Sequence, residues 1–188
     1  PFFNERLGFL RRYRKWMDKN YPDLPIKMSE WTHMVGGKNP SMDSALETVK
    51  VMIEDFTLLG VTSWQHWIAC SHYDYDDGLI YLDIEKKSCE TTKRLYATGN
   101  FSKYIPLGAK RIEAKSDDAD IMLIAFENEE KTVLIIANPT DKEKSYALTC
   151  DALVAVTDNE KNLEECRMRA GESVAISPES VTTVVFQK

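Results

Sequence analysis

The sequence contains no apolar run that approaches the roughly 20 residues a membrane-spanning helix requires, so no membrane span is predicted. It also has no excess of basic residues, because 24 Lys and Arg stand against 30 Asp and Glu, which gives a formal net charge of -6. Binding to phosphates needs a basic face, and here the basic residues are interspersed with acids throughout. We therefore expect no nucleic-acid partner.

Features typical of metal sites are also missing. The four cysteines show no CxxC or other close spacing, and the three histidines fit no standard ligand pattern. The segment DYDDG has some likeness to a calcium loop, but it lacks the glutamate ligand that should follow. The spacing therefore predicts no metal site, and we leave open whether the cysteines are buried thiols or form occasional disulfides: Cys70, Cys89, Cys150 and Cys166.

The first half of the chain alternates helical and strand-like segments. Apolar residues at helical spacing predict two helices, one over Asn4 to Asn20 and one that follows Ser41 and ends at Gly60. Between them, a strand is predicted from Ile26 to Glu30. Val61 to Ile68 is again strand-like. This order is typical of parallel-sheet units. A short strand or hairpin at Gly78 to Asp83 and a third helix over Glu90 to Tyr104 complete the half.

The second half is rich in β-branched, strand-like runs. Two of them, separated by a charged turn, lie within IMLIAFENEEKTVLIIANPT, and LVAVTD, SVAIS and TTVVFQ continue the pattern to the end. We predict an antiparallel sheet or sandwich here, with a boundary near Pro106 to Gly108. The two expected domains are residues 1–106, which are α/β, and residues 107–188, which are all β.

One acidic residue has a position that suggests chemistry. Glu30 ends the first strand and is followed at once by Trp31. An α/β barrel presents catalytic groups at the carboxyl ends of its strands, and a carboxylate beside an aromatic ring suits a sugar. Glycoside hydrolysis needs two carboxylates, however, and the chain supplies only one in such a place. The alternative is an ordinary exposed carboxylate at a strand end.

Four motifs, in order, resemble the C-terminal part of glycoside hydrolase family 30, the group that contains glucosylceramidase, glucuronoxylanases and β-1,6-glucanases or galactanases. KMSEW resembles the seventh barrel strand with its nucleophilic glutamate, and VTSWQHW resembles the eighth strand. TKRLYATGNFSKYIPLGAKRI resembles the last barrel helix running into the side domain. AFENEEKTVLIIANPT resembles a hairpin of that side domain.

This resemblance implies the C-terminal part of a (β/α)8 TIM barrel followed by an antiparallel β-sandwich. It also implies retaining hydrolysis of a β-linked oligo- or polysaccharide, no cofactor, and an extracellular or periplasmic location. Glu30 would be the nucleophile, and the ring of Trp67 would form the floor of a sugar subsite. Trp31 would wall the same cleft, His66 would donate a hydrogen bond to a sugar hydroxyl, and Tyr75 would stack on sugar from the loop Ser71 to Gly78. Trp64 is expected in the core.

The chain departs from the family pattern in one respect. The general acid/base of the family lies in an Asn-Glu-Pro motif after the fourth strand, and this tripeptide is absent. We therefore expect the chain to be an inactive fragment whose partner is the missing N-terminal part of the same protein. The rival hypothesis is a non-catalytic carbohydrate-binding or scaffold protein with the same architecture.

Overall fold

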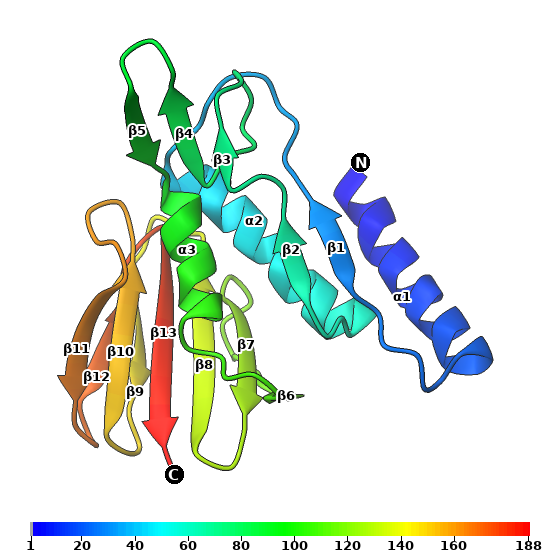
Figure 1. Cartoon of the computed structure of the whole chain (residues 1–188). Coiled ribbons are helices and arrows are strands. Elements are labelled where there is room, and N and C mark those ends of the chain that lie inside the picture. Colours follow the sequence, from blue (N-terminus) through cyan, green and yellow to red (C-terminus); the bar gives the residue numbers. More distant parts are fainter. Residues whose placement is uncertain (1) are drawn as a thin grey trace.

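The computed structural model describes residues 2–188, with side chains from residue 5 onward, so residue 1 of the predicted barrel portion lies outside the described residues. Figure 1 shows an α/β part on one side and a β-sandwich on the other, joined through α3. The helices of the described chain are α1 (Phe2–Asn20), α2 (Met42–Glu54), the π-helix η1 (Asp55–Leu59) and α3 (Lys93–Ser102). None of them combines the length and apolar character needed to cross a membrane.

The first helix confirms the predicted amphipathic segment and extends it by two residues. Leu10 and Met17 are buried on one face, and Leu10 packs in a cluster with Leu59 and Val61. Arg6 adds an ion pair with Glu54 at 2.6 Å. These contacts fix α1 against η1 and against the chain that enters the second strand.

Two strands of the α/β part pair in parallel: β1 (Met28–Trp31) and β2 (Trp64–His66). The predicted strand from Val61 to Ile68 is therefore shorter than expected. Its first residues serve other purposes, since Gly60 ends η1 in the left-handed conformation (φ 69°) and Val61 turns into the core. The strands run side by side between α1 and α2 (Figure 1).

The helix predicted to end at Gly60 does end there, but its last turn is a π-helix. Ser41 has the extended backbone of an N-cap residue, yet its side chain makes no capping hydrogen bond to α2. The widened turn at η1 places Asp55 so that it accepts a hydrogen bond from the Trp64 indole at 2.9 Å. Trp64 thus packs in the core, as expected.

A small three-stranded sheet lies beyond β2 and projects from the molecule as the β4–β5 hairpin in Figure 1: β3 (Cys70–Ser71), β4 (Ile80–Asp83) and β5 (Ser88–Thr91). The prediction that the third helix begins at Glu90 was wrong, because Glu90 lies in β5, where it pairs with Tyr81 of β4. Thr92 instead caps the helix and accepts the Leu95 amide at 3.3 Å.

The second half forms the expected antiparallel sandwich. One sheet has six strands in the order β11-β10-β13-β8-β7-β6, and the other pairs β12 with β9. The strands are β6 (Lys110–Ile112), β7 (Met122–Glu127), β8 (Lys131–Asn138), β9 (Lys144–Ala147), β10 (Ala152–Thr157), β11 (Glu164–Met168), β12 (Ser173–Ile176) and β13 (Ser180–Gln187).

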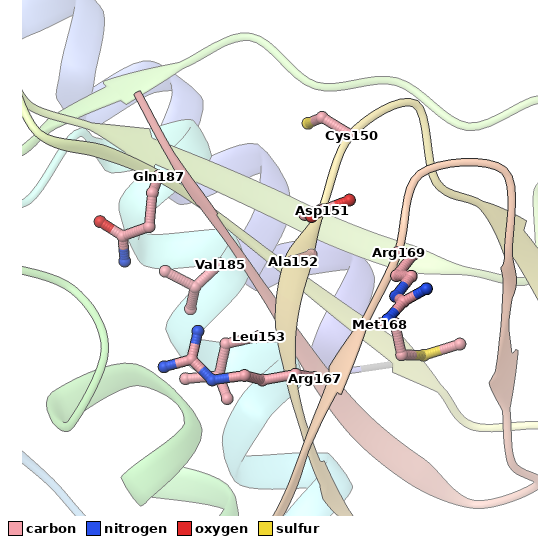
Figure 2. A pocket seen from close by; sticks show the side chains of 9 residues that line it. All are labelled: Cys150, Asp151, Ala152, Leu153, Arg167, Met168, Arg169, Val185 and Gln187. Atoms are coloured by element: carbon pink, nitrogen blue, oxygen red, sulfur yellow. The ribbon is translucent and has the colours of Figure 1, made fainter.

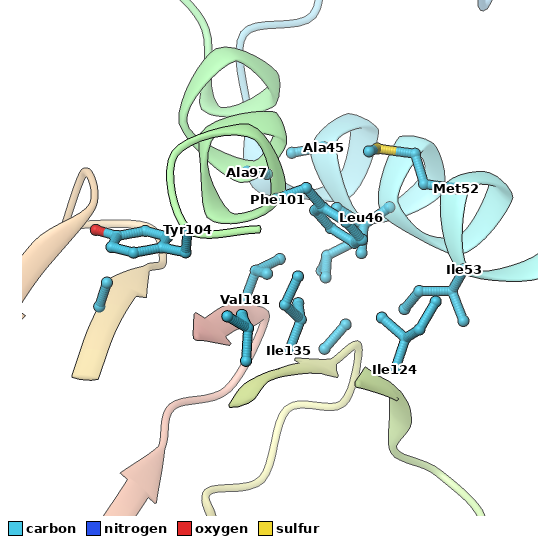
Figure 3. Packing of buried hydrophobic residues seen from close by; sticks show 14 of the residues in the cluster. Ala45, Leu46, Met52, Ile53, Ala97, Phe101, Tyr104, Ile124, Ile135 and Val181 are labelled. Atoms are coloured by element: carbon cyan, nitrogen blue, oxygen red, sulfur yellow. The ribbon is translucent and has the colours of Figure 1, made fainter. Parts of the chain in front are cut away.

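The main core lies between the helices and the six-stranded sheet. Figure 3 shows Phe101 of α3 directed toward the sheet that carries Ile135 and Val181, and Met52 of α2 belongs to the same cluster. A second core lies between the large sheet and β9–β12, around Val154, Val174 and Val184. The first core therefore crosses the predicted boundary near Pro106, so α2 and α3 are held firmly on the sandwich. The boundary itself stays a prediction.

Candidate active site

The carboxyl ends of β1 and β2 lie at the same edge of their sheet because the two strands are parallel. Glu30 is near the end of β1, and its side chain is exposed. Among the residues whose side chains the structure describes, no hydrogen bond or ion pair engages its carboxylate. A free carboxylate at such an edge is available to a ligand.

Trp67 follows the end of β2 at the same edge. Its amide donates to the Trp31 carbonyl at 2.8 Å, which continues the pairing of the two strands beyond β2. The peptide bond between Trp67 and Ile68 is cis. The Trp67 side chain is 50% exposed. The structure therefore presents an indole from the second strand beside the edge that carries Glu30.

A row of four aromatic rings lies behind this edge. The Trp31 ring is 5.7 Å from Trp64, 5.9 Å from His66 and 6.3 Å from His33, measured between ring centroids. Trp64 bonds to Asp55 of η1, and His33 contacts Glu47 of α2, so the row faces the helices.

Trp31 is half-buried whereas Glu30 is exposed, and the register of β1 on β2 is irregular between Met28 and Trp31. His66 belongs with Trp31, since the two residues are register partners whose rings meet. The two rings thus support each other beside the strand end, and their contact with a sugar stays a prediction.

His66 is held as a neutral imidazole. Burial lowers its pKa to about 4, and the hydrogen bond to the Asp77 carbonyl opposes this only in part. The Nε2–H donates to the Asp77 carbonyl at 2.8 Å, which assigns the proton to that nitrogen. Nδ1 is buried and lacks a partner among the described residues. Near neutral pH the ring is thus uncharged and fixed in orientation.

The loop Ser71 to Gly78 at this edge carries both exposed and buried side chains. Tyr73 and Tyr75 are exposed, and Tyr75 forms an isolated bridge with Gly36 of the loop that follows β1. Asp76 and Asp77 are each only 4% exposed, whereas Asp74 of the same loop is exposed. Within the predicted site, the loop therefore offers its tyrosines to a ligand.

A buried arginine fixes this loop to two helices. Arg94 of α3 is fully buried and donates to the Thr48 hydroxyl at 3.0 Å and the Gly78 carbonyl at 3.0 Å. Its other guanidinium nitrogen contacts both Ser44 and Asp76. The arginine thus joins α2, α3 and the loop Ser71 to Gly78, which we call the mouth loop, in one network.

Asp76 is ionised within this network. Burial by itself raises the pKa of Asp76, but hydrogen bonds from Ser44 and Arg94 and the Arg94 charge outweigh that effect and hold it below its usual range. The carboxylate also accepts from His33 Nδ1 at 2.9 Å. The sequence did not single out Asp76 and Arg94, because a charged residue in an amphipathic helix or a polar loop is expected to be exposed to solvent.

No group of three or more His, Cys, Asp or Glu side chains in the described part of the chain is arranged to hold a metal ion. A separate hollow of about 670 Å³ lies at the ends of β10, β11 and β13. In Figure 2 its walls include Arg167, Leu153 and Gln187, and none of its lining residues is a predicted site residue. With Asp151 as its one acid, it does not contain the paired carboxylates of a hydrolase.

Two family models match this chain. The model described as O-Glycosyl hydrolase family 30 matches residues 28–81, which include β1, β2 and the mouth loop. The model described as Glycosyl hydrolase family 30 beta sandwich domain matches residues 108–184. Together the two matches include Glu30 and Trp67 on one side and nearly the whole sandwich on the other.

Solved structures share the fold. A conserved exported protein from Bacteroides fragilis superposes with a TM-score of 0.84 at 22% identity, over 96% of this chain and 42% of its own. A GH30 endoxylanase from Clostridium papyrosolvens gives 0.74 at 16% identity, over 93% and 45%. The catalytic domain of GH30 xylanase C from Talaromyces cellulolyticus gives 0.75 at 15%, over 88% and 41%.

The chain thus spans less than half of the length of each of these three proteins. The likeness confirms the predicted fold class, the C-terminal part of a (β/α)8 barrel followed by an antiparallel β-sandwich.

Proposed function

The chain belongs to glycoside hydrolase family 30, and from this we propose that the protein it comes from hydrolyses a β-linked glycan, with Glu30 as its nucleophile. The observation that carries the proposal is the position of Glu30: exposed, near the carboxyl end of a parallel strand, and next to the strand that leads into Trp67.

The reaction would follow a double displacement. The ionised Glu30 carboxylate attacks the anomeric carbon and forms a glycosyl ester, while an acid about 5 to 5.5 Å away protonates the departing glycosidic oxygen. Water then attacks the same carbon, the acid residue now acts as base, and the carbon–oxygen bond to Glu30 breaks. This chain supplies the nucleophile, and the acid/base would come from a part of the protein outside it.

The substrate we propose is a polysaccharide. The Trp67 indole offers an apolar floor for a sugar ring, and Tyr73 and Tyr75 extend an exposed aromatic rim beyond it. Two of the similar structures are named xylanases, which makes xylan the first substrate to examine. Export from the cell, as for the similar protein from Bacteroides fragilis, suits a polymeric substrate.

The partner we propose for this chain is the rest of the same barrel. The similar structures are more than twice its length, and two strands cannot close a barrel of eight. On α1 the rings of Phe9, Tyr13 and Trp16 stack along an exposed face next to the open edge of β1. Further barrel elements would cover this face.

The test is a comparison of wild type with Glu30→Gln in the full-length protein, using xylan, a β-1,6-glucan and a β-1,6-galactan. We expect hydrolysis of one polymer and at least a thousandfold loss of kcat in the variant, with unchanged melting temperature, because the exchanged group is exposed. The control is Glu129→Gln, an exposed acid in the β7–β8 turn.

Hydrolysis that survives in Glu30→Gln would refute the nucleophile assignment. Binding of one polymer with no turnover in the wild type would instead favour the non-catalytic carbohydrate-binding alternative. The isolated 188-residue chain should be inactive on all three polymers.

A further inference from the structure

Two imidazoles flank the Trp31 indole, the side chain next to Glu30 in β1. The His33 ring lies nearly parallel to it, at an interplanar angle of 11°, and the His66 ring approaches at 47°. Trp64 contacts both Trp31 and His66. The indole is therefore enclosed by rings, and its position depends on theirs.

Each imidazole is held in turn by the aspartate pair of the mouth loop. Asp76 accepts from His33 Nδ1 at 2.9 Å through its carboxylate, and Asp77 accepts from His66 Nε2 at 2.8 Å through its carbonyl. His33 Nε2 also lies 3.4 Å from the Glu47 carboxylate, a longer and more exposed contact. The bond to Asp76 is thus the shorter and better buried of the two that orient His33.

Asp76 has little freedom to move. One of its oxygens accepts from the Ser44 hydroxyl at 2.7 Å, the other contacts Arg94, and the backbone amide of Asp76 donates to the Val35 carbonyl at 2.8 Å. Helices α2 and α3, which carry Ser44 and Arg94, are themselves packed on the sandwich through the main core. Asp76 therefore links the loop after β1 to the rigid body of the molecule.

We propose that Asp76 is a positioning residue for Glu30, which acts by holding His33 against Trp31 and so fixing the strand end that carries the nucleophile. The inference rests on the proposed function, since it concerns the residues that hold the proposed nucleophile in place. Displacements of about 1 Å at a reacting group can cost about a hundredfold in rate, so a nucleophile on the end of a short strand needs such support.

The experiment uses the full-length protein and the variant His33→Phe, which keeps a ring beside Trp31 and removes the donor to Asp76. The substrate is whichever of the three polymers the wild type hydrolyses. We expect kcat to fall at least tenfold while KM changes less than threefold, because the polymer contacts remain. The stability-matched control is Val174→Ala, a buried residue of β12 remote from the site.

A purely structural role for His33 would make the two variants behave alike once their melting temperatures match. A kcat for His33→Phe within twofold of that for Val174→Ala would therefore overturn the proposal. The proposed function is tested separately, by Glu30→Gln: if that variant retains activity, the proposed function fails, whatever the result for His33→Phe.

A second measurement does not depend on turnover. In the 188-residue chain, amide hydrogen exchange should rise at residues 30–35 in His33→Phe and in Asp76→Asn, while the amides of β8 keep their protection. Unchanged exchange at residues 30–35 in both variants would also overturn the proposal. Of the two variants, Asp76→Asn is the less specific test, because it also leaves the buried Arg94 with a neutral amide in place of a carboxylate.

Discussion

Neighbouring residues at the end of β1 have opposite surroundings, and the difference accounts for their separate roles. Glu30 is exposed and has no partner among the described side chains, whereas Trp31 is enclosed by Trp64, His33 and His66. The ring contacts of Trp31 secure the strand end from behind, while the neighbouring carboxylate stays open to a ligand. An exposed nucleophile can thus be held on a firmly packed strand.

The lowered pKa of His66 predicts a pH dependence of stability. The folded state holds this imidazole neutral down to about pH 4, whereas the unfolded chain takes up a proton near the ordinary histidine pKa of 6.5. The unfolded state therefore binds more protons between these values, and stability is lost as the pH falls from about 6.5 to about 4, by about 2 to 3 kcal/mol.

The measurement is urea unfolding of the 188-residue chain at about pH 7 and about pH 4.5, compared with His66→Gln, which has no imidazole to protonate. Burial raises the pKa of Glu54 and Asp55, which works in the opposite direction, but both groups are present in each protein and cancel in the difference. Equal losses in wild type and variant would contradict the assignment of the effect to His66.

At the scale of elements, α3 joins the two halves of the molecule. Its first turn contributes Arg94 to the mouth network, and its last turn contributes Phe101 to the main core. Between them, Asn100 is fully buried against the large sheet. Its amide donates to the Thr183 hydroxyl at 2.9 Å and the Ala155 carbonyl at 3.3 Å, and its oxygen accepts from Thr157 at 2.7 Å.

Replacing Asn100 with Ala should destabilise the chain by about 3 kcal/mol, because buried partners on β10 and β13 lose their hydrogen bonds in a site closed to water. Asn162→Ala is the matched control, since Asn162 also contacts α3, through Lys93 Nζ at 2.8 Å, but at an exposed position. That variant should lose less than about 1 kcal/mol. The free energies of unfolding of both variants are measured by chemical denaturation, and similar losses of stability in the two would refute the role given to Asn100.

Elements that follow a clear apolar pattern could be predicted from the sequence, and those that depend on distant partners could not. The runs that became β7, β8, β10 and β13 are apolar and β-branched, so the sandwich was predictable. The short β5 has the sequence SCET, exposed at every position, and gives no such signal. It was assigned in part to the helix that follows.

The candidate site divides in the same way. Glu30 and Trp67 were predicted from motifs, and whether they act on substrate stays a prediction. The network behind them was not foreseen, because Arg94 lies 18 residues after Asp76 and 50 after Ser44, and only the packing of α2 on α3 brings the three together. A buried arginine has no local signature when its partners come from two other elements, here α2 and the loop Ser71 to Gly78.

At the scale of the whole molecule, the chain has one well-covered side and one open side. The six-stranded sheet is covered on one face by α2 and α3 and on the other by β9–β12. The β1–β2 sheet has only two strands, and α1 next to it exposes an aromatic face on which Phe9 is 56% and Trp16 50% exposed. Exposed aromatic surface of this kind favours association.

The last prediction concerns this aromatic face. In the 188-residue chain, Phe9→Ser combined with Trp16→Ser should leave the melting temperature nearly unchanged, because both rings are about half exposed, and should reduce self-association measured by sedimentation. In the full-length protein the same pair should lower stability by about 2 kcal/mol or more, since the proposed barrel elements bury apolar surface there. A double variant that unfolds the short chain, or leaves the full-length protein as stable as before, would show that α1 does not receive the rest of the barrel on this face.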